Sequence, residues 1–253
     1  MITTGELYSY FDRKIPRALS CDWDNDGLMV CADGTREVKK VLFALDVTDA
    51  VADCAIAGGY DLIISHHPLI FSPLKAINTE NPVCARALRL IAAGISVFSF
   101  HTRLDALEGG VNDILAASLG LENTRPFGPA GAEIGRIGEL PREMTAEEFA
   151  ALVKERVSRH ITGHFTGRKI RTVAVLGGSG RDFIDAAKAA GAEVFLCGEA
   201  GYHAVLDAPS LGIGIVEAGH YETERGVSAF FAEAFRSDYP DIAFEIYPRD
   251  NEF

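Results

Sequence analysis

The residues of this chain best suited to chemistry are its histidines, most of which directly follow short apolar segments. Five of the seven lie there: His66, His67, His101, His203 and His220. Neutral imidazole binds divalent metal ions and also transfers protons near neutral pH. If the apolar segments are parallel strands, the histidines gather at the sheet edge where open α/β proteins bind ligands. We therefore expect a metal or proton-transfer site there.

Two carboxylates extend this set of candidate ligands. Glu224 follows His220 by four residues, so that both can face one point at the start of a helix. Asp105 stands four residues after His101. Adjacent residues in extended backbone point to opposite sides, so the pair at 66 and 67 suits two ions better than one. The predicted ligands, which exceed the needs of one tetrahedral site, are His66, His67, Asp105, His220 and Glu224.

A dinuclear centre with Asp105 as the bridging carboxylate would use all of these ligands. Imidazole and carboxylate suit Zn, Fe, Mn, Ni or Co, and the sequence does not select among these metals. Two ions can lower the pKa of a bridging water towards neutrality and polarise a bond under attack. His101 and His203 are then candidate catalytic residues, because an imidazole pKa near 6.5 suits proton transfer.

Structural interpretations remain open for single histidines, because a lone buried histidine is commonly a hydrogen-bonded core residue. His203 is as well explained by packing as by a place near the metals. His160 and His164 share the four-residue spacing of a ligand pair, but Thr162 and Gly163 between them are poor helix formers. We interpret His160 and His164 as surface residues.

The elements that must position these residues alternate between apolar strands and alanine-rich helices, which predicts a mostly parallel sheet covered on both faces. The expected strands are residues 41–45, 62–65, 96–100, 172–176, 194–197, 213–216 and 244–247. The expected helices are residues 48–57, 82–93, 111–119, 146–157, 181–190 and 223–236. Thr145 and Glu148 have the spacing of a capping box at a helix start.

Proline and glycine concentrate in residues 123–133, which we interpret as a domain junction. Residues 163–171 look like a second polar connection. Residues 177–180, Gly-Gly-Ser-Gly, could present backbone N–H groups to an anion, although a tight strand-to-helix turn explains them equally well and no nucleotide motif is present. Residues 22–28 hold three acids but lack the final glutamate of a calcium loop. We expect a turn whose polar groups face the site.

Composition narrows the class of protein. The 253 residues include 36 acidic and 24 basic side chains, for a formal charge of −12. This charge disfavours binding to nucleic acid or to anionic membranes. The five cysteines form no CxxC pair, which favours free thiols in a reducing compartment. No apolar run reaches the roughly 20 residues that span a bilayer, and residues 1–16 lack a signal-peptide core. We expect a cytoplasmic protein.

Several phrases together resemble the GTP cyclohydrolase I type 2 homologues, also called the Nif-three-like dinuclear metal proteins. They occur in order over nearly the whole chain, and the last is the most specific. The matching phrases are residues 23–28 (WDNDGL), 45–48 (LDVT), 61–71 (DLIISHHPLIF), 101–105 (HTRLD), 198–203 (GEAGYH) and 219–224 (GHYETE).

The resemblance implies the same five metal ligands and two α/β/α layered domains with mostly parallel or mixed sheets. The dinuclear site would lie between the domains at the strand C-terminal ends. We place the first domain at residues 1–126 plus 218–253 and the second at 127–217. The family further implies a homohexameric ring with its metal sites facing the inner cavity. This chain has the length of the compact form, without the inserted domain.

Two residues depart from the family pattern. Arg103 stands where a small polar residue such as asparagine is expected, and Glu199 stands where aspartate is expected. Neither departure removes a ligand, but a cation beside Asp105 could change which anions the site accepts.

The predicted function is a dinuclear metal-dependent hydrolase. The resemblance implies GTP cyclohydrolase activity on GTP or another phosphorylated, nucleotide-like small molecule. The same ligand set would also serve phosphoester or amide hydrolysis. The alternatives are a non-catalytic metal-binding regulator, a metal-trafficking protein and an interaction scaffold that metals stabilise.

Overall fold

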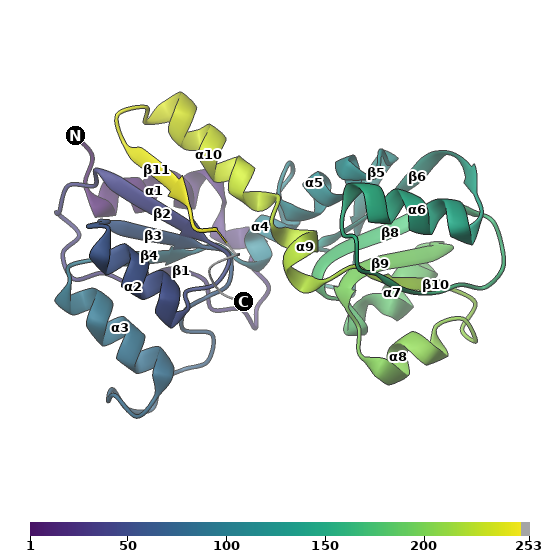
Figure 1. The fold of residues 1–253 in the computed structure, drawn as a ribbon, viewed down its shortest axis with the longest axis horizontal. Coiled ribbons are helices and arrows are strands. Elements are labelled where there is room, and N and C mark those ends of the chain that lie inside the picture. Colours follow the sequence, from purple (N-terminus) through teal and green to yellow (C-terminus); the bar gives the residue numbers. More distant parts are fainter. Residues whose placement is uncertain (249–253) are drawn as a thin grey trace. The chain divides into compact units, whose positions relative to one another are not determined.

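The computed structural model describes residues 1–248 and divides the chain into two compact units (Figure 1). Unit 1 comprises Met1–Leu104 and Ser228–Phe253, and unit 2 comprises Asp105–Val227. The sequence-based boundaries were 126/127 and 217/218 instead. Residues 123–133 do not form a junction, because strand β5 (Glu122–Phe127) pairs with β6 (Gly135–Met144) inside unit 2. The prolines and glycines of this stretch serve an edge strand and a turn.

Unit 1 contains a five-stranded mixed sheet in the order β1-β4-β3-β2-β11. Only β1 runs antiparallel to its neighbour, and the other pairs are parallel. The strands are β1 (Gly27–Val30), β2 (Lys40–Ala44), β3 (Leu62–Ser65), β4 (Ser96–Ser99) and β11 (Ala243–Ile246). Because β3 and β4 are parallel and Ser65 pairs with Ser99, the residues after both strands emerge at the same sheet edge.

Helices cover both faces of this sheet (Figure 1). On one face, α2 (Asp49–Ala57) and α3 (Pro82–Ala92) pack on the strands through a buried aliphatic cluster. On the other face, α1 (Thr4–Lys14) and α10 (Val227–Asp238) contribute phenylalanines, and the ring of Phe231 lies 5.5 Å from Phe11 and 5.3 Å from Phe43 of β2. The alternation of side chains along each strand supplies both cores.

Unit 2 contains a six-stranded mixed sheet in the order β5-β6-β8-β9-β10-β7. Its central pairs β8–β9 and β9–β10 are parallel, and its outer pairs are antiparallel. The further strands are β7 (Thr162–His164), β8 (Ile170–Ser179), β9 (Val194–Glu199) and β10 (Gly214–Glu217). The polar connection expected at 163–171 is therefore partly wrong, because its first residues pair with β10 as an edge strand.

Helices α5 (Val111–Ser118) and α6 (Ala146–Arg156) share an apolar cluster with β6, β8, β9 and β10. Figure 1 shows α7 (Ile184–Ala189) and α8 (Tyr202–Asp207) on the opposite face of this sheet. Each unit is thus an α/β layer structure built on a mixed sheet. Among the described residues, no helix combines the length and the apolar character that crossing a bilayer requires.

Local sequence explains where several of the helices begin. The capping box at Thr145 and Glu148 is confirmed, and Thr3 with Glu6 forms a second one. The helix expected at 223–236 is wrong at its start, because it divides into α9 (His220–Glu224) and α10. Gly226 lies at the break, and a β-carbon there would come within 2.7 Å of the Ile114 side chain. The short α9 places Glu224 one turn after His220.

Candidate metal centre

Unit 1 brings three imidazoles together at the C-terminal edge of its sheet. His66 and His67 follow β3, and His101 follows β4. One ligand atom from each lies within 4.8 Å of the corresponding atoms of the other two. The ring centroids are separated by 5.0 to 5.7 Å. The sequence-based expectation that these strand ends converge is confirmed, and His101 joins a group that could hold a metal ion.

Each of these imidazoles has its Nδ1 atom engaged by an oxygen atom. His66 Nδ1 donates to the Phe100 carbonyl at 2.9 Å. His67 Nδ1 donates to Asp46 at 2.8 Å, and His101 Nδ1 donates to Asp24 at 2.9 Å. Protonation at Nδ1 leaves Nε2 as the lone-pair nitrogen of a neutral ring. Metal-binding histidines characteristically have this second partner, which fixes both the tautomer and the ring orientation. The donor set of unit 1 therefore fits a divalent ion.

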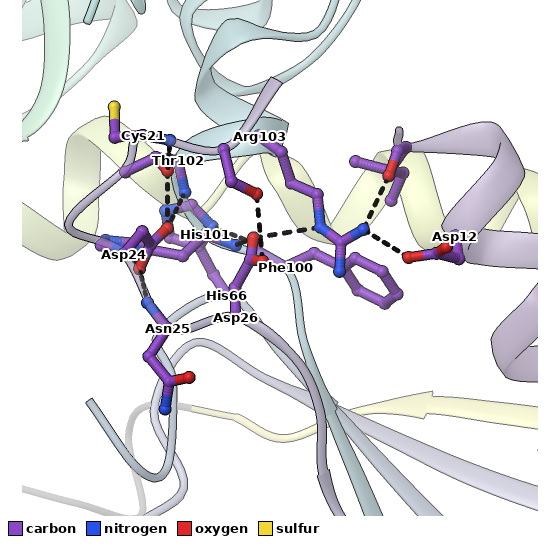
Figure 2. Close-up of polar contacts among 12 residues, drawn as sticks. Asp12, Cys21, Asp24, Asn25, Asp26, His66, Phe100, His101, Thr102 and Arg103 are labelled. Atoms are coloured by element: carbon purple, nitrogen blue, oxygen red, sulfur yellow. Dashed lines mark hydrogen bonds and ion pairs between the residues drawn. The ribbon is translucent and has the colours of Figure 1, made fainter. Parts of the chain in front are cut away.

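The turn at residues 22–28 supports this edge (Figure 2). Asp24 accepts from His101 Nδ1 and also from the Thr102 backbone N–H and hydroxyl, at 3.0 and 2.6 Å. Burial opposes the ionisation of Asp24, but the bond and charge of His101 and the bonds from Thr102 outweigh it and lower the pKa of Asp24 to about 2. The expectation that polar groups of this turn face the site is confirmed.

Arg103 has a structural role in unit 1 and leaves no charge for an anion. Its side chain is buried, and it pairs with Asp26 at 3.0 Å and with Asp12 at 2.7 Å (Figure 2). The guanidinium also donates to the Ile15 carbonyl and lies over the Phe100 ring. The expectation that Arg103 alters anion selection is therefore wrong, because two carboxylates already neutralise the guanidinium.

Unit 2 carries the pair predicted from i,i+4 spacing. His220 and Glu224 lie on α9, and His220 Nε2 is 3.3 Å from Glu224 Oε2. His220 Nδ1 lies 3.2 Å from Glu199, the residue that departs from the family pattern. This glutamate therefore contacts the same ring nitrogen that a carboxylate partner of a metal-bound histidine contacts. Asp105 lies at the unit boundary on α4 (Thr102–Ala106), and its side chain is buried.

The glycines at the end of β8 pack closely against His220 and Glu224 of α9. A β-carbon on Gly178 would lie 2.4 Å from Glu224 Oε1 and 3.0 Å from His220 Nε2. Gly178 N–H donates to the Thr223 hydroxyl, and Gly177 N–H donates to the Asn112 side chain. The anion-binding interpretation of residues 177–180 fails, because these N–H groups bond within unit 2. Glycine is needed here to leave space for the candidate ligands.

Asn112 is a buried residue that the sequence reasoning missed. Its Nδ2 donates to the Ile134 carbonyl at 2.9 Å and to the Asp105 carbonyl at 3.4 Å. Its Oδ1 accepts from Gly177 N–H at 2.7 Å. One amide therefore joins the backbone of Asp105 to the strand that backs Glu224. Its position one residue into α5 carried no sequence signal, because asparagine near a helix start is ordinarily a local cap.

The remaining candidates lie apart from these groups. His203 is exposed on α8 with its ring against Tyr202, and within residues 1–248 it belongs to no group of three that could hold an ion. His160 is exposed and His164 is half-buried on the edge strand β7. Burial and the neighbouring carboxylates raise the pKa of the Cys197 thiol, so this cysteine stays protonated. The sequence reasoning also missed Asp46, the partner of His67 Nδ1. Its position directly after the apolar segment 41–45 is the signal that could have identified it.

Comparison with known proteins reveals similarity along nearly the whole chain. The sequence profile of the family described as Duf34/NIF3 (NGG1p interacting factor 3) matches residues 2–252. A protein named GTP cyclohydrolase 1 type 2 homolog from Clostridium acetobutylicum is 35% identical over 229 residues, which cover 87% of this chain and 84% of the relative.

Two solved structures are similar in fold as well as in sequence. Reduced HcgD from Methanocaldococcus jannaschii has a TM-score of 0.85 at 29% identity, with 97% of each chain covered. A Bacillus cereus protein related to NIF3 has a TM-score of 0.84 at 27% identity, with 97% of this chain and 96% of that chain covered. These likenesses extend over both units.

Proposed function

The chain belongs to the Duf34/NIF3 family, and from this premise we propose that it is a hydrolase that depends on divalent metal ions. At 253 residues it is a compact member of that family. The observation that carries the proposal is the common orientation of the imidazoles. The three histidines proposed as ligands, at residues 66, 67 and 220, each have Nδ1 against an oxygen atom, a pattern typical of metal ligands.

The proposed ligands come from both units. Unit 1 supplies His66 and His67, and unit 2 supplies Asp105, His220 and Glu224. When bound, two divalent ions would contribute Lewis acidity to the hydrolysis of a polar bond. The prediction that one dinuclear centre uses all five side chains is tested by the metal content of variants in each unit.

His101 is the proposed proton-transfer residue. Its Nδ1 proton is held by Asp24, and a carboxylate with a pKa of about 2 remains ionised at neutral pH. Asp24 thereby fixes the His101 ring with Nε2 as the lone-pair nitrogen, the atom that can accept a proton and later release it. His203 remains the second candidate of the sequence analysis, and its exposed position on α8 makes it the weaker one.

The proposed substrate is GTP or another phosphorylated, nucleotide-like small molecule. The support is similarity to proteins named GTP cyclohydrolase 1 type 2 homolog. A homohexamer is proposed from the same family resemblance, and light scattering on the purified protein measures it.

Metal content and hydrolysis on the same samples test the proposal. The variants are His67→Ala in unit 1 and Glu224→Ala in unit 2, with the exposed His160→Ala as the matched control. About two ions per subunit are expected in the wild type and in the control, with loss in both ligand variants. GTP and a chromogenic phosphoester are the substrates, and turnover is expected to fall with metal content.

Other outcomes contradict the proposal in different ways. Metal retained in full by both ligand variants refutes the ligand assignment. Loss in one variant alone indicates independent ions in the two units instead of a shared centre. Tight metal binding without turnover of any phosphorylated substrate favours the alternative of a metal-binding regulator or trafficking protein. Loss of the oligomer on chelation favours a metal-stabilised scaffold.

A further inference from the structure

Two aromatic side chains lie exposed beside the histidines of unit 1. Trp23 is 57% exposed and Phe71 is 49% exposed. Their ring centroids are 6.3 Å apart and the planes are tilted by 59°. Large apolar rings that remain in water at a fixed place commonly mark a binding surface.

The rings are grouped around His101. The His101 ring centroid lies 6.2 Å from Trp23 and 6.2 Å from Phe71, edge-on to both. Through His101 they adjoin the group of three imidazoles whose ligand atoms lie within 4.8 Å of one another. A molecule that contacts the two rings is thus placed beside the proposed proton-transfer residue.

Buried and half-buried polar contacts hold the two chain segments that carry these rings. Asp24, next to Trp23, binds His101 and Thr102 through three hydrogen bonds. The Asn25 side chain donates to the Ile70 carbonyl at 2.5 Å, directly before Phe71. The two segments that carry the rings are therefore tied to the sheet edge and to each other. A surface already fixed in this way loses little conformational entropy on binding.

We propose that Trp23 and Phe71 form a subsite for a planar heteroaromatic ring of the substrate. This inference rests on the proposed function, because it names the part of the substrate that lies beside His101. A planar ring is the occupant that the geometry favours, since aromatic faces bind π-systems by stacking or edge contacts. A protein segment laid over both rings would also cover His101, which the proposed chemistry needs accessible.

Trp23 is the only tryptophan of the chain, so its fluorescence reports directly on the subsite. Guanosine 5′-monophosphate and ribose 5-phosphate are the matched probes, because they share sugar and phosphate and differ by the ring. With excitation at the red edge of tryptophan absorption, saturable quenching is expected for the nucleotide alone. Phe71→Leu is expected to weaken nucleotide binding by roughly 5- to 150-fold, the range of one lost stacking contact. Tyr202→Leu, which removes another exposed ring, is the control and leaves binding unchanged.

The possible results separate this inference from the proposed function. Equal quenching by ribose 5-phosphate, or wild-type nucleotide affinity in Phe71→Leu, overturns the subsite. Trp23 emission that changes with protein concentration instead of nucleotide also overturns it, because a second copy then covers the rings. Metal content is measured on every sample. Intact metal without ring-dependent quenching refutes the subsite alone, whereas absent metal with ring-dependent quenching supports the subsite and refutes the proposed hydrolase.

Discussion

Asn112 supports both the folding of unit 2 and the metal ligands that unit 2 supplies, so its removal should lower the free energy of unfolding and the metal affinity together. The test is Asn112→Leu, which keeps a side chain of similar size and removes the amide. Asn112 is fully buried, and its amide makes short bonds to Gly177 N–H and to the Ile134 carbonyl, with a longer one to the Asp105 carbonyl. In the leucine variant these buried backbone groups have lost the hydrogen bonds that the amide makes.

The magnitude follows from the groups left without a partner. Each buried donor or acceptor that loses its bond costs about 1–3 kcal/mol, and the leucine recovers part of this through its apolar contacts. We expect a loss of about 3 kcal/mol in the free energy of unfolding. The substitution removes the hydrogen bonds that hold the Asp105 backbone and Gly177, which packs against Glu224. We therefore also expect metal affinity to fall by about 10- to 100-fold, as for other groups that orient ligands.

Two assays separate these effects. Urea unfolding with a chelator present measures the stability of the metal-free protein, and competition with a fluorescent chelator measures zinc affinity. Asn81→Ala is the matched control, because Asn81 also accepts two backbone N–H groups but does so as the cap of α3 in unit 1. It should cost about 1 kcal/mol and leave zinc affinity unchanged. A destabilised Asn112→Leu protein with wild-type zinc affinity would falsify the positioning role.

Three further predictions concern other contacts. Asp26→Asn should cost about 3 kcal/mol in urea unfolding because it breaks a buried ion pair, whereas Asp12→Asn, at a carboxylate that is 39% exposed, should cost under about 1 kcal/mol. Equal losses would contradict this account. Gly178→Ala and Gly212→Ala both place a side chain at a positive φ, which costs about 1–2 kcal/mol each. Only Gly178→Ala should lose metal, because its β-carbon would press on Glu224 and His220, whereas a β-carbon at Gly212 has no neighbour within 4 Å. Metal analysis showing equal retention refutes the steric argument. Asp24 has a folded-state pKa of about 2 against an ordinary 3.8, so its stabilisation is complete above pH 4 and is lost between pH 4 and 2. Over that window the unfolding free energy of wild type should fall more steeply than that of Asp24→Asn, and parallel curves would refute the assignment.

The α/β class and the central strands could be predicted from the sequence because buried parallel strands are continuous apolar runs. The runs 62–65 and 194–197 correspond closely to β3 and β9. The edge strands β5 and β7 were missed, since their residues are largely polar and exposed and contain proline or glycine. The interior strand β6 was missed as well, because it is antiparallel to both neighbours and mixes apolar with polar residues instead of forming a continuous apolar run. Their strand character comes from hydrogen bonds to neighbours distant in the chain, which no local pattern records.

Most of the candidate metal ligands could also be predicted from the sequence. His66, His67 and the pair His220 and Glu224 follow strand ends or share helical spacing, and both are local properties. Arg103 was misjudged, because its charge was visible but its partners were not. Asp12 and Asp26 reach it from segments 91 and 77 residues away in the chain.

By itself, then, the sequence determined which side chains are available for metal chemistry and which segments become buried strands. Periodicity, residue type and spacing are local, and they survive without knowledge of the fold. Only the tertiary structure decided which oxygen faces each Nδ1 atom, which glycines press on Glu224, and that Asn112 joins Asp105 to Gly177. These contacts depend on the packing of segments far apart in the chain, where differences of an ångström separate a hydrogen bond from none.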